Sequence, residues 1–289
     1  LLLDDDSHPE LGAIEKIIEE VTQLDDTCLG LITEIHNPDG NREASLLPTV
    51  FHGAGVAFKT AAMRNNKLYY PENYCFYGEE YRLSLEIYAK GFHLKSSTAK
   101  IIHRRSPSGR NLEKIFYYLG RNNKIIWQDL VPEKYLRDVL YDSQRRYELT
   151  SQKENTEESL TQGLQEQLST DKRTPMTEAH FEEFSLINKF NEIPAAEKFI
   201  LCGTGKFTSL WAKLLSTKCS ELIIADFNTA FHNQNYGAYN ICSPENCLKS
   251  NGTFLIGHSS SIDTENWAQL LQKNNIDFYD LRDRQLQSI

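Results

Sequence analysis

The chain opens on an apolar run, residues 1–3, that ends in three consecutive aspartates, Asp4, Asp5 and Asp6. We expect the leucines to form a buried strand that carries the carboxylates at its C-terminal tip. In an open α/β sheet, ligands bind in the crevice outside the carboxyl ends of the strands. Clustered carboxylates repel one another unless a cation lies among them, and hard oxygen ligands suit Mg²⁺ or Mn²⁺. The alternative interpretation is a solvated acidic turn before a helix, because Asp and Ser are common at helix N-termini.

Segments of strand and helix character alternate along the rest of the chain, which predicts an α/β fold. The expected strands of the first part are 28–35, 56–58, 92–96 and 99–103, and its expected helices are 11–24, 81–90 and 111–130. A second α/β unit shows strand segments at 199–202, 222–226 and 253–257, with helices at 206–215 and 267–273.

Residues 150–197 are rich in Gln, Glu, Ser and Thr and have an acidic excess, so they predict a linker with one or two exposed helices. We therefore expect a first domain over 1–132, a helical, acidic linker over 133–196 and a small α/β domain over 197–289.

Composition restricts the class of protein. No apolar stretch approaches the roughly 20 residues that cross a bilayer, and the start lacks a signal-peptide pattern, so we expect a cytoplasmic protein. A formal net charge of -9 argues against general nucleic-acid binding. The six cysteines include no C-x-x-C pair, so neither a zinc site nor a disulfide framework is indicated.

The helix expected over 111–130 is amphipathic, with its apolar side chains on one side. The basic side chains of the opposite side are Arg110, Lys114, Arg121 and Lys124. A surface helix with a solvated basic face is one interpretation. The other is contact with anionic lipid headgroups or a lipid-linked acceptor at the inner face of the membrane.

The second α/β unit carries a glycine-rich turn, Gly203-Thr204-Gly205, directly after a strand. A helix follows, and the next strand ends in Asp226, which matches the opening of a dinucleotide-binding fold. The fingerprint is incomplete because Thr208 stands at the third glycine position. Gly203, Gly205 and Asp226 are thus candidate contacts for a nucleotide in a Rossmann-like domain, and a purely structural half of such a domain is the alternative.

The first domain contains further residues that could take part in binding or catalysis. They are the glycines Gly53 and Gly55, the acidic pair Glu79 and Glu80, and His103 at the end of a strand. Sugar transfer from a nucleotide diphosphate needs a cation that neutralises the departing diphosphate and a carboxylate that takes a proton from the attacking hydroxyl. Each group also has a structural interpretation, since Glu79-Glu80 suits the first turn of a helix and glycines mark bends.

The order of these motifs is informative. The acidic cluster 4–6 is followed by the glycine-rich segment 52–58, the acidic pair within 76–83, the strand ending at 101–103, and the basic aromatic segment 117–122. This order resembles the inverting glycosyltransferase family 2, particularly its bacterial rhamnosyl- and galactosyltransferase-like members, over roughly residues 1–132. The resemblance implies a GT-A fold and a role in cell-surface polysaccharide (O-antigen or capsule) biosynthesis.

The resemblance also implies roles for single residues. Asp4 and Asp5, with the loop of Gly53 and Gly55, would contact the nucleotide-sugar donor. Asp6 would ligate Mn²⁺ or Mg²⁺ together with Asp4, and His103 would lie near the metal and the leaving group. Glu80 would be the general base, and Glu79 would orient a saccharide or lipid-linked acceptor.

Two departures from the family concern the base. The family usually has Asp where Glu80 stands, so this base reaches one methylene further, and it often has an acid where Arg82 stands. In the family, upstream βαβ units hold the nucleotide, so the chain resembles the acceptor-side half of a GT-A domain. A competing interpretation is a nucleotide-binding or assembly module that acts through the C-terminal unit, with a catalytically inactive first domain.

Overall fold

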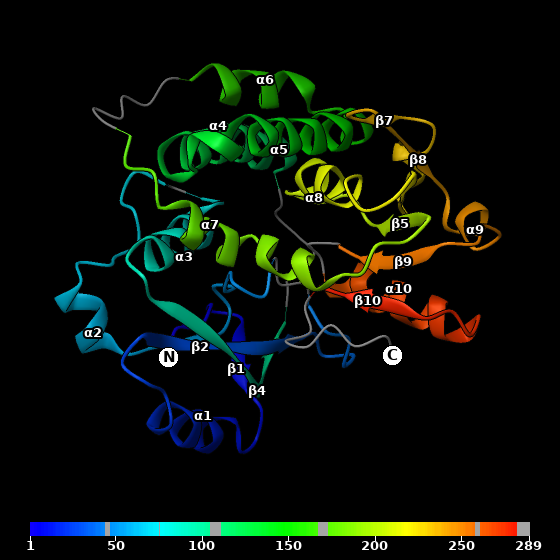
Figure 1. Cartoon of the computed structure of the whole chain (residues 1–289). Helices are drawn as coiled ribbons and strands as arrows, with labels where there is room; N and C mark the ends of the chain where they lie inside the picture. The colour runs from blue at the N-terminus through cyan, green and yellow to red at the C-terminus, as the bar shows by residue number, and fades with distance from the viewer. Residues whose placement is uncertain (44–46, 75, 105–110, 167–172, 258–260, 282–289) are drawn as a thin grey trace.

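The computed structural model describes residues 1–43, 47–74, 76–104, 111–166, 173–257 and 261–281. It confirms the α/β fold class, because strands and helices alternate and the described strands form two separate sheets (Figure 1). No helix in this part of the chain is long and apolar enough to cross a membrane.

The first sheet has the strand order β1-β4-β2-β3. Its strands are β1 (Ser7–Pro9), β4 (His93–His103), β2 (Cys28–His36) and β3 (Val56–Phe58). The two central strands are parallel, and each edge strand is antiparallel to its neighbour. Helix α1 (Ala13–Thr22) packs on one face of this sheet, and α3 (Glu79–Ala89) lies over the other face (Figure 1). The short helix α2 (Thr60–Asn65) follows β3.

The expected strand at residues 1–3 is wrong. Leu2 makes a single antiparallel bridge to Val56, and Leu1 and Leu2 are exposed. The bridge meets only the first residue of β3, so no ladder extends from it. The regular strand β1 instead follows the aspartates. The two expected strands 92–96 and 99–103 are one strand, β4, whose pairing with β2 shifts register partway along.

The second sheet has the strand order β10-β9-β5-β6-β8-β7. Its strands are β10 (Phe278–Asp280), β9 (Thr253–Ile256), β5 (Lys198–Cys202), β6 (Glu221–Ala225), β8 (Tyr239–Cys242) and β7 (Asn235–Tyr236). All neighbouring pairs are parallel except β7 and β8. The chain runs outward from β5 through β6 to β8 and then returns to the other side of β5 for β9 and β10.

Helices cover both faces of the second sheet. Along β5, Phe199 and Leu201 join the core cluster that includes α8 (Thr208–Leu215), whereas Ile200 and Cys202 pack with Trp267 of α10 (Ser261–Lys273). This alternation follows from the two-residue period of a strand. The short helix α9 (Pro244–Cys247) lies beside β6.

Helix α4 (Leu112–Leu130) ends the part expected as the first domain, and three helices occupy the range that we expected to be a linker. They are α5 (Glu133–Glu154), α6 (Glu157–Gln165) and α7 (Glu178–Phe184), and a 3₁₀ helix (Ile187–Glu192) leads to β5. The prediction of exposed linker helices is wrong, because Phe181 and Phe184 of α7 are fully buried, as is Val139 of α5. A single apolar cluster runs from the first sheet through these helices to the second sheet.

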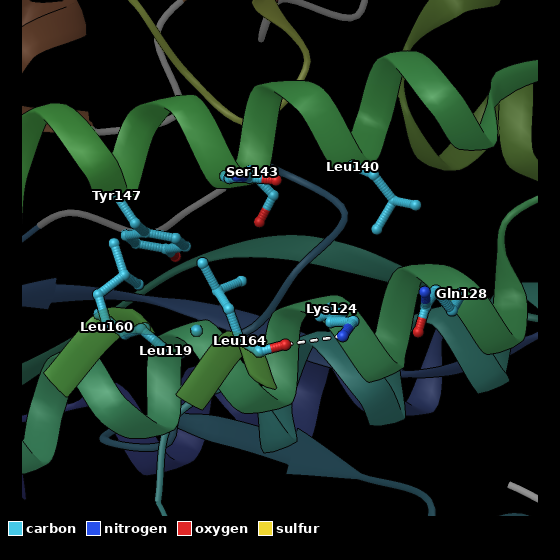
Figure 2. Close-up of a pocket in the computed structure, with 10 residues that line it drawn as sticks. Leu119, Lys124, Gln128, Leu140, Ser143, Tyr147, Leu160 and Leu164 are labelled. Carbon is cyan, nitrogen blue, oxygen red and sulfur yellow. Dashed lines mark hydrogen bonds between the residues drawn. The ribbon is translucent and has the colours of Figure 1, made fainter. Parts of the chain in front are cut away.

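Helix α6 lies directly on α4. Two glycines permit this approach, since a Cβ added at Gly163 would lie 2.1 Å from the carbonyl oxygen of Tyr117, and one at Gly120 would lie 2.9 Å from that of Leu160. Beside this contact, α4, α5 and α6 surround a cavity of about 250 Å³ that is lined by leucines, Tyr147 and a few polar side chains (Figure 2).

Candidate active site

The structure brings Asp4, Asp6 and His103 together. One ligand atom of each residue lies within 4.8 Å of the others. The sheet register explains the contact, because β1 pairs with β4 so that Ser7 is opposite His103, and the aspartates lie immediately before Ser7. The backbone N–H of Arg104 also donates to the carbonyl of Asp6 at 2.9 Å. We call these three residues the Asp–His cluster.

Both ring nitrogens of His103 face carboxylates. Nε2 lies 3.0 Å from Oδ1 of Asp6, and Nδ1 contacts Oε2 of Glu43. His103 and Glu43 are both buried, at 8% exposure each. If Nδ1–H donates to Glu43, the lone pair of Nε2 points at the Asp6 carboxylate. That contact is favourable only with a proton or a cation between the two groups, and a histidine held by a carboxylate at its other nitrogen is the usual arrangement of metal ligands.

Glu80 lies next to the cluster, with Gly53 between. A Cβ added at Gly53 would lie 3.4 Å from Oε1 of Glu80 and 3.7 Å from Oδ1 of Asp4. Burial raises the pKa of the Glu80 carboxyl to about 7, and the charges of Glu79 and Asp4 act in the same direction. Hydrogen bonds from the N–H groups of Glu80 and Gly53 oppose this rise in pKa. Gly53 thus both leaves room for the two carboxylates and supplies an N–H to one of them.

Glu79 shares this environment. Burial, with the nearby charge of Asp4, raises the pKa of its carboxyl. Its Oε2 is buried and has no hydrogen-bond partner among the described residues. Tyr70 also faces the site, since burial and then the charges of Glu80, Glu79 and Asp4 raise the pKa of its hydroxyl. A buried acceptor without a donor, next to a carboxyl with a raised pKa, marks these residues as a candidate functional site.

The local backbone directs the acidic pair into the site. Gly78, which precedes α3, has a φ of 101°, a conformation that favours glycine, and Tyr77 before it has a φ of 61°. The side-chain amide of Asn122 donates to the carbonyls of Phe76 and Tyr77, both at 2.8 Å. Helix α4 therefore fixes the turn from which Glu79 and Glu80 project.

Asp5 and Gly55, which we expected to contact the donor, have surroundings that differ from those of Asp4 and Gly53. Asp5 is exposed and is not part of the Asp–His cluster. Gly55 is buried, and a Cβ there would lie 2.4 Å from Oγ1 of Thr33 and 2.9 Å from the side chain of Ile101. Gly55 therefore permits close packing inside the first sheet.

The expected basic face of α4 is wrong for two of its residues, because α6 covers that face. Arg121 is only 8% exposed, and its Nε lies 3.4 Å from Glu166. The Nζ of Lys124 donates to the carbonyl of Leu164 at 2.7 Å (Figure 2). Lys114 is exposed, with its Nζ 4.3 Å from the ring centre of Phe76. Arg110 lies outside the described residues.

The glycine-rich turn of the second sheet uses its donors internally. The N–H and hydroxyl of Thr204 donate to Oδ2 of Asp226 at 2.7 and 2.8 Å, and the N–H of Gly205 donates to Oγ1 of Thr208 at 2.5 Å. Gly203 has a φ of 98°, and its N–H donates to the carbonyl of Ala225. The N–H groups of Gly203, Thr204 and Gly205 are thus already bonded within the protein.

Sequence reasoning missed Glu43, Tyr70 and the buried Lys206, whose Nζ lies 3.6 Å from the ring centre of Tyr81, the residue after Glu80. Glu43 is 60 positions from His103, but the turn chemistry of residues 37–41 was a usable signal. A bridge between His36 and Arg42 closes that turn and returns the chain to the first sheet at Glu43. No pattern in the sequence indicates Tyr70 or Lys206.

No protein-family model, no curated protein and no solved structure matches this chain. The chemistry of the site is therefore inferred from its own geometry.

Proposed function

We propose that the protein is an inverting, metal-dependent glycosyltransferase that moves a sugar from a nucleotide-diphosphate sugar to a hydroxyl acceptor in polysaccharide assembly. The observation that carries the proposal is the position of Glu80, held by the N–H of Gly53 beside Asp4 of the Asp–His cluster. A proton acceptor next to groups that bind a cation is what transfer from a nucleotide diphosphate requires.

The donor set of the Asp–His cluster fits a divalent cation. Two carboxylates and one imidazole suit Mn²⁺ well, whereas Mg²⁺ prefers oxygen ligands alone. Asp4, Asp6 and Nε2 of His103 would hold the ion, and Glu43 would keep His103 in the tautomer that offers Nε2. A bound cation would supply the positive charge that stabilises the departing diphosphate.

Glu80 is suited to take the proton of the acceptor hydroxyl. A general base works best when its pKa is near the working pH, and burial raises the pKa of Glu80 to about 7. The free Oε2 of Glu79 would accept a hydrogen bond from the acceptor and orient it. A single base and direct attack by the hydroxyl give inversion at the anomeric carbon.

The fold is compatible with this function. We interpret the first sheet, with its acidic cluster before β1 and its histidine at the end of β4, as part of a GT-A domain. We interpret the second sheet as Rossmann-like, since its parallel strands β8-β6-β5-β9-β10 have the spatial order 3-2-1-4-5 of that fold. The competing idea of a nucleotide at Gly203 and Gly205 has less support, because Asp226 and Thr208 accept the donors of that turn.

Binding of a nucleoside diphosphate tests this proposal. Titration of the chain with UDP, GDP and dTDP, with and without Mn²⁺, should show binding of one of them only in the presence of the ion. Asp6→Ala should weaken that binding at least about tenfold, the cost of losing one charged ligand. Asp5→Ala is the matched control and should bind as the unmodified chain does, since Asp5 lies outside the cluster. Binding that ignores Mn²⁺ or the Asp6 substitution would exclude the metal assignment.

A further inference from the structure

A second cavity, lined mainly by polar side chains, lies at the carboxyl edge of the second sheet. Its volume is about 420 Å³, and it is an open pocket between the C-terminal half of α5 and the segment that follows β6. Ligands of open α/β sheets bind at this edge. The cavity is separate from the Asp–His cluster and shares no residue with it.

One face of α5 lines the cavity with two cations and a hydroxyl. Arg146, Thr150 and Lys153 are spaced four and three residues apart, so they lie on the same side of the helix. Arg146 uses Nη1 to donate to the carbonyl of Thr204 at 2.6 Å, which leaves its other N–H groups available. Lys153 is exposed at the mouth of the cavity.

Some of the basic side chains of α5 form ion pairs with carboxylates and others do not. Lys134, Arg137 and Arg145 each have a carboxylate within 4.0 Å, namely that of Glu178, Asp138 and Glu148 respectively. Within the described residues, Arg146 and Lys153 have none. The two cations of α5 that lack an acid are thus the two that face the cavity. A half-buried guanidinium without a carboxylate in direct contact is costly, and an anionic ligand bound to it would lower that cost.

The opposite wall has different chemistry. Asp226, Asn228 and Thr229 follow β6, and Asp263 belongs to α10. Carboxylates repel a phosphate but accept hydrogen bonds from hydroxyls, and the ring of Phe227 offers an apolar surface to a sugar ring. The two walls together require a ligand with an anionic end and a hydroxyl-bearing end.

We propose that this cavity binds a phosphorylated sugar, with the phosphate on Arg146 and Lys153 and the hydroxyls toward Asn228 and Asp263. Asp226 holds that wall in place, because its two oxygens accept from Thr204 and from the N–H of Asn228. Arginine presents several N–H groups in one plane and so matches a phosphate well. No residue of the glycine-rich turn lines the cavity, so the ligand needs none of the turn's internally bonded N–H groups.

Calorimetry on the full chain at 150 mM salt tests the proposal with four probes: ribose 5-phosphate, inorganic phosphate, ribose and gluconate. Ribose 5-phosphate should bind most tightly, phosphate more weakly, and ribose not at all. Lys153→Ala should weaken binding of ribose 5-phosphate about tenfold, the loss of one charge-assisted hydrogen bond, and Lys153→Glu should abolish it.

Arg137→Ala is the matched control, because Arg137 is an exposed cation of the same helix that does not line the cavity. It should leave binding unchanged. Absence of binding for ribose 5-phosphate at 10 mM, equal binding of ribose, or tighter binding of gluconate would each overturn the proposal. So would binding that survives Lys153→Glu. None of these results depends on glycosyl transfer, so this proposal and the proposed function can fail separately.

Discussion

The Nζ of Lys206 donates to Oδ1 of Asn123 at 2.8 Å and lies 3.6 Å from the ring centre of Tyr81. Lys206 belongs to the glycine-rich turn after β5, whereas Asn123 lies on α4 and Tyr81 on α3, directly after Glu80. The second sheet therefore contacts the helix that carries the proposed base. Burial lowers the pKa of Lys206 well below its usual value; the charge of Arg146 adds to this effect, and that of Glu80 opposes it.

Lys206→Met should change how stability depends on pH. A lysine with a lowered pKa in the folded state binds fewer protons there than in the unfolded chain, so its contribution to the free energy of unfolding rises with pH up to about 10.4. Between pH 7 and pH 10, the free energy of unfolding of the unmodified chain should therefore rise relative to that of Lys206→Met. Denaturant unfolding at several pH values measures it. Lys213→Met, an exposed lysine of α8, is the control, and parallel curves for Lys206→Met would contradict the account.

For Glu80→Gln, the stability of the unmodified chain relative to the variant should fall as pH rises, the opposite of the trend expected for Lys206→Met. The pKa of Glu80 is raised from 4.5 to about 7 in the folded state, so ionisation of this carboxyl opposes folding as pH rises through that window. Glutamine keeps an acceptor for the N–H of Gly53 but carries no charge. The variant should match the unmodified chain near pH 4 and exceed its free energy of unfolding at pH 8, by at most about 3 kcal/mol. Glu15→Gln, on the exposed side of α1, should show no such gain in stability. If the free energies of unfolding of Glu80→Gln and the unmodified chain differed by the same amount at every pH, the raised pKa of Glu80 would be refuted.

Gly163→Ala should destabilise the protein. In an open helix this change stabilises by up to about 1 kcal/mol, but here the new Cβ would meet the carbonyl oxygen of Tyr117 at 2.1 Å and push α6 off α4. We expect a loss of about 2 kcal/mol or more, measured by urea unfolding. Gln165→Ala, at an exposed position of the same helix, should be nearly neutral. A stabilised Gly163→Ala variant would mean that α6 does not pack on α4 as described.

The sequence predicted best the central strands of the second sheet and helix α4. The strands expected at 199–202, 222–226 and 253–257 match β5, β6 and β9 within a residue, because parallel strands that are buried on both faces are continuous apolar runs. The helix at 111–130 matches α4. Composition misled at 150–197, where a few aromatic residues such as Phe181 and Phe184 anchor an otherwise polar stretch in the core.

The candidate site was predictable only in part. The family resemblance grouped Asp6 with His103, and the structure brings them together through the pairing of β1 with β4, which the sequence did not predict. The contact between His103 and Glu43 depends on a loop closing 60 positions away, and the burial of Arg121 depends on α6 covering α4. The burial of Arg121 leaves no local pattern in the sequence, and the turn residues at 37–41 are the one local sign of the contact between His103 and Glu43.

Turnover by Glu80→Gln tests the central claim most directly. Release of the nucleoside diphosphate from a nucleotide sugar, in the presence of Mn²⁺ and a hydroxyl acceptor, should fall about 10²- to 10⁴-fold in kcat, the usual contribution of a general base. The Kd for the nucleoside diphosphate should stay within about twofold, and Glu72→Gln, an exposed acid, should keep full activity. Unchanged turnover by Glu80→Gln would contradict the assignment of Glu80 as the base.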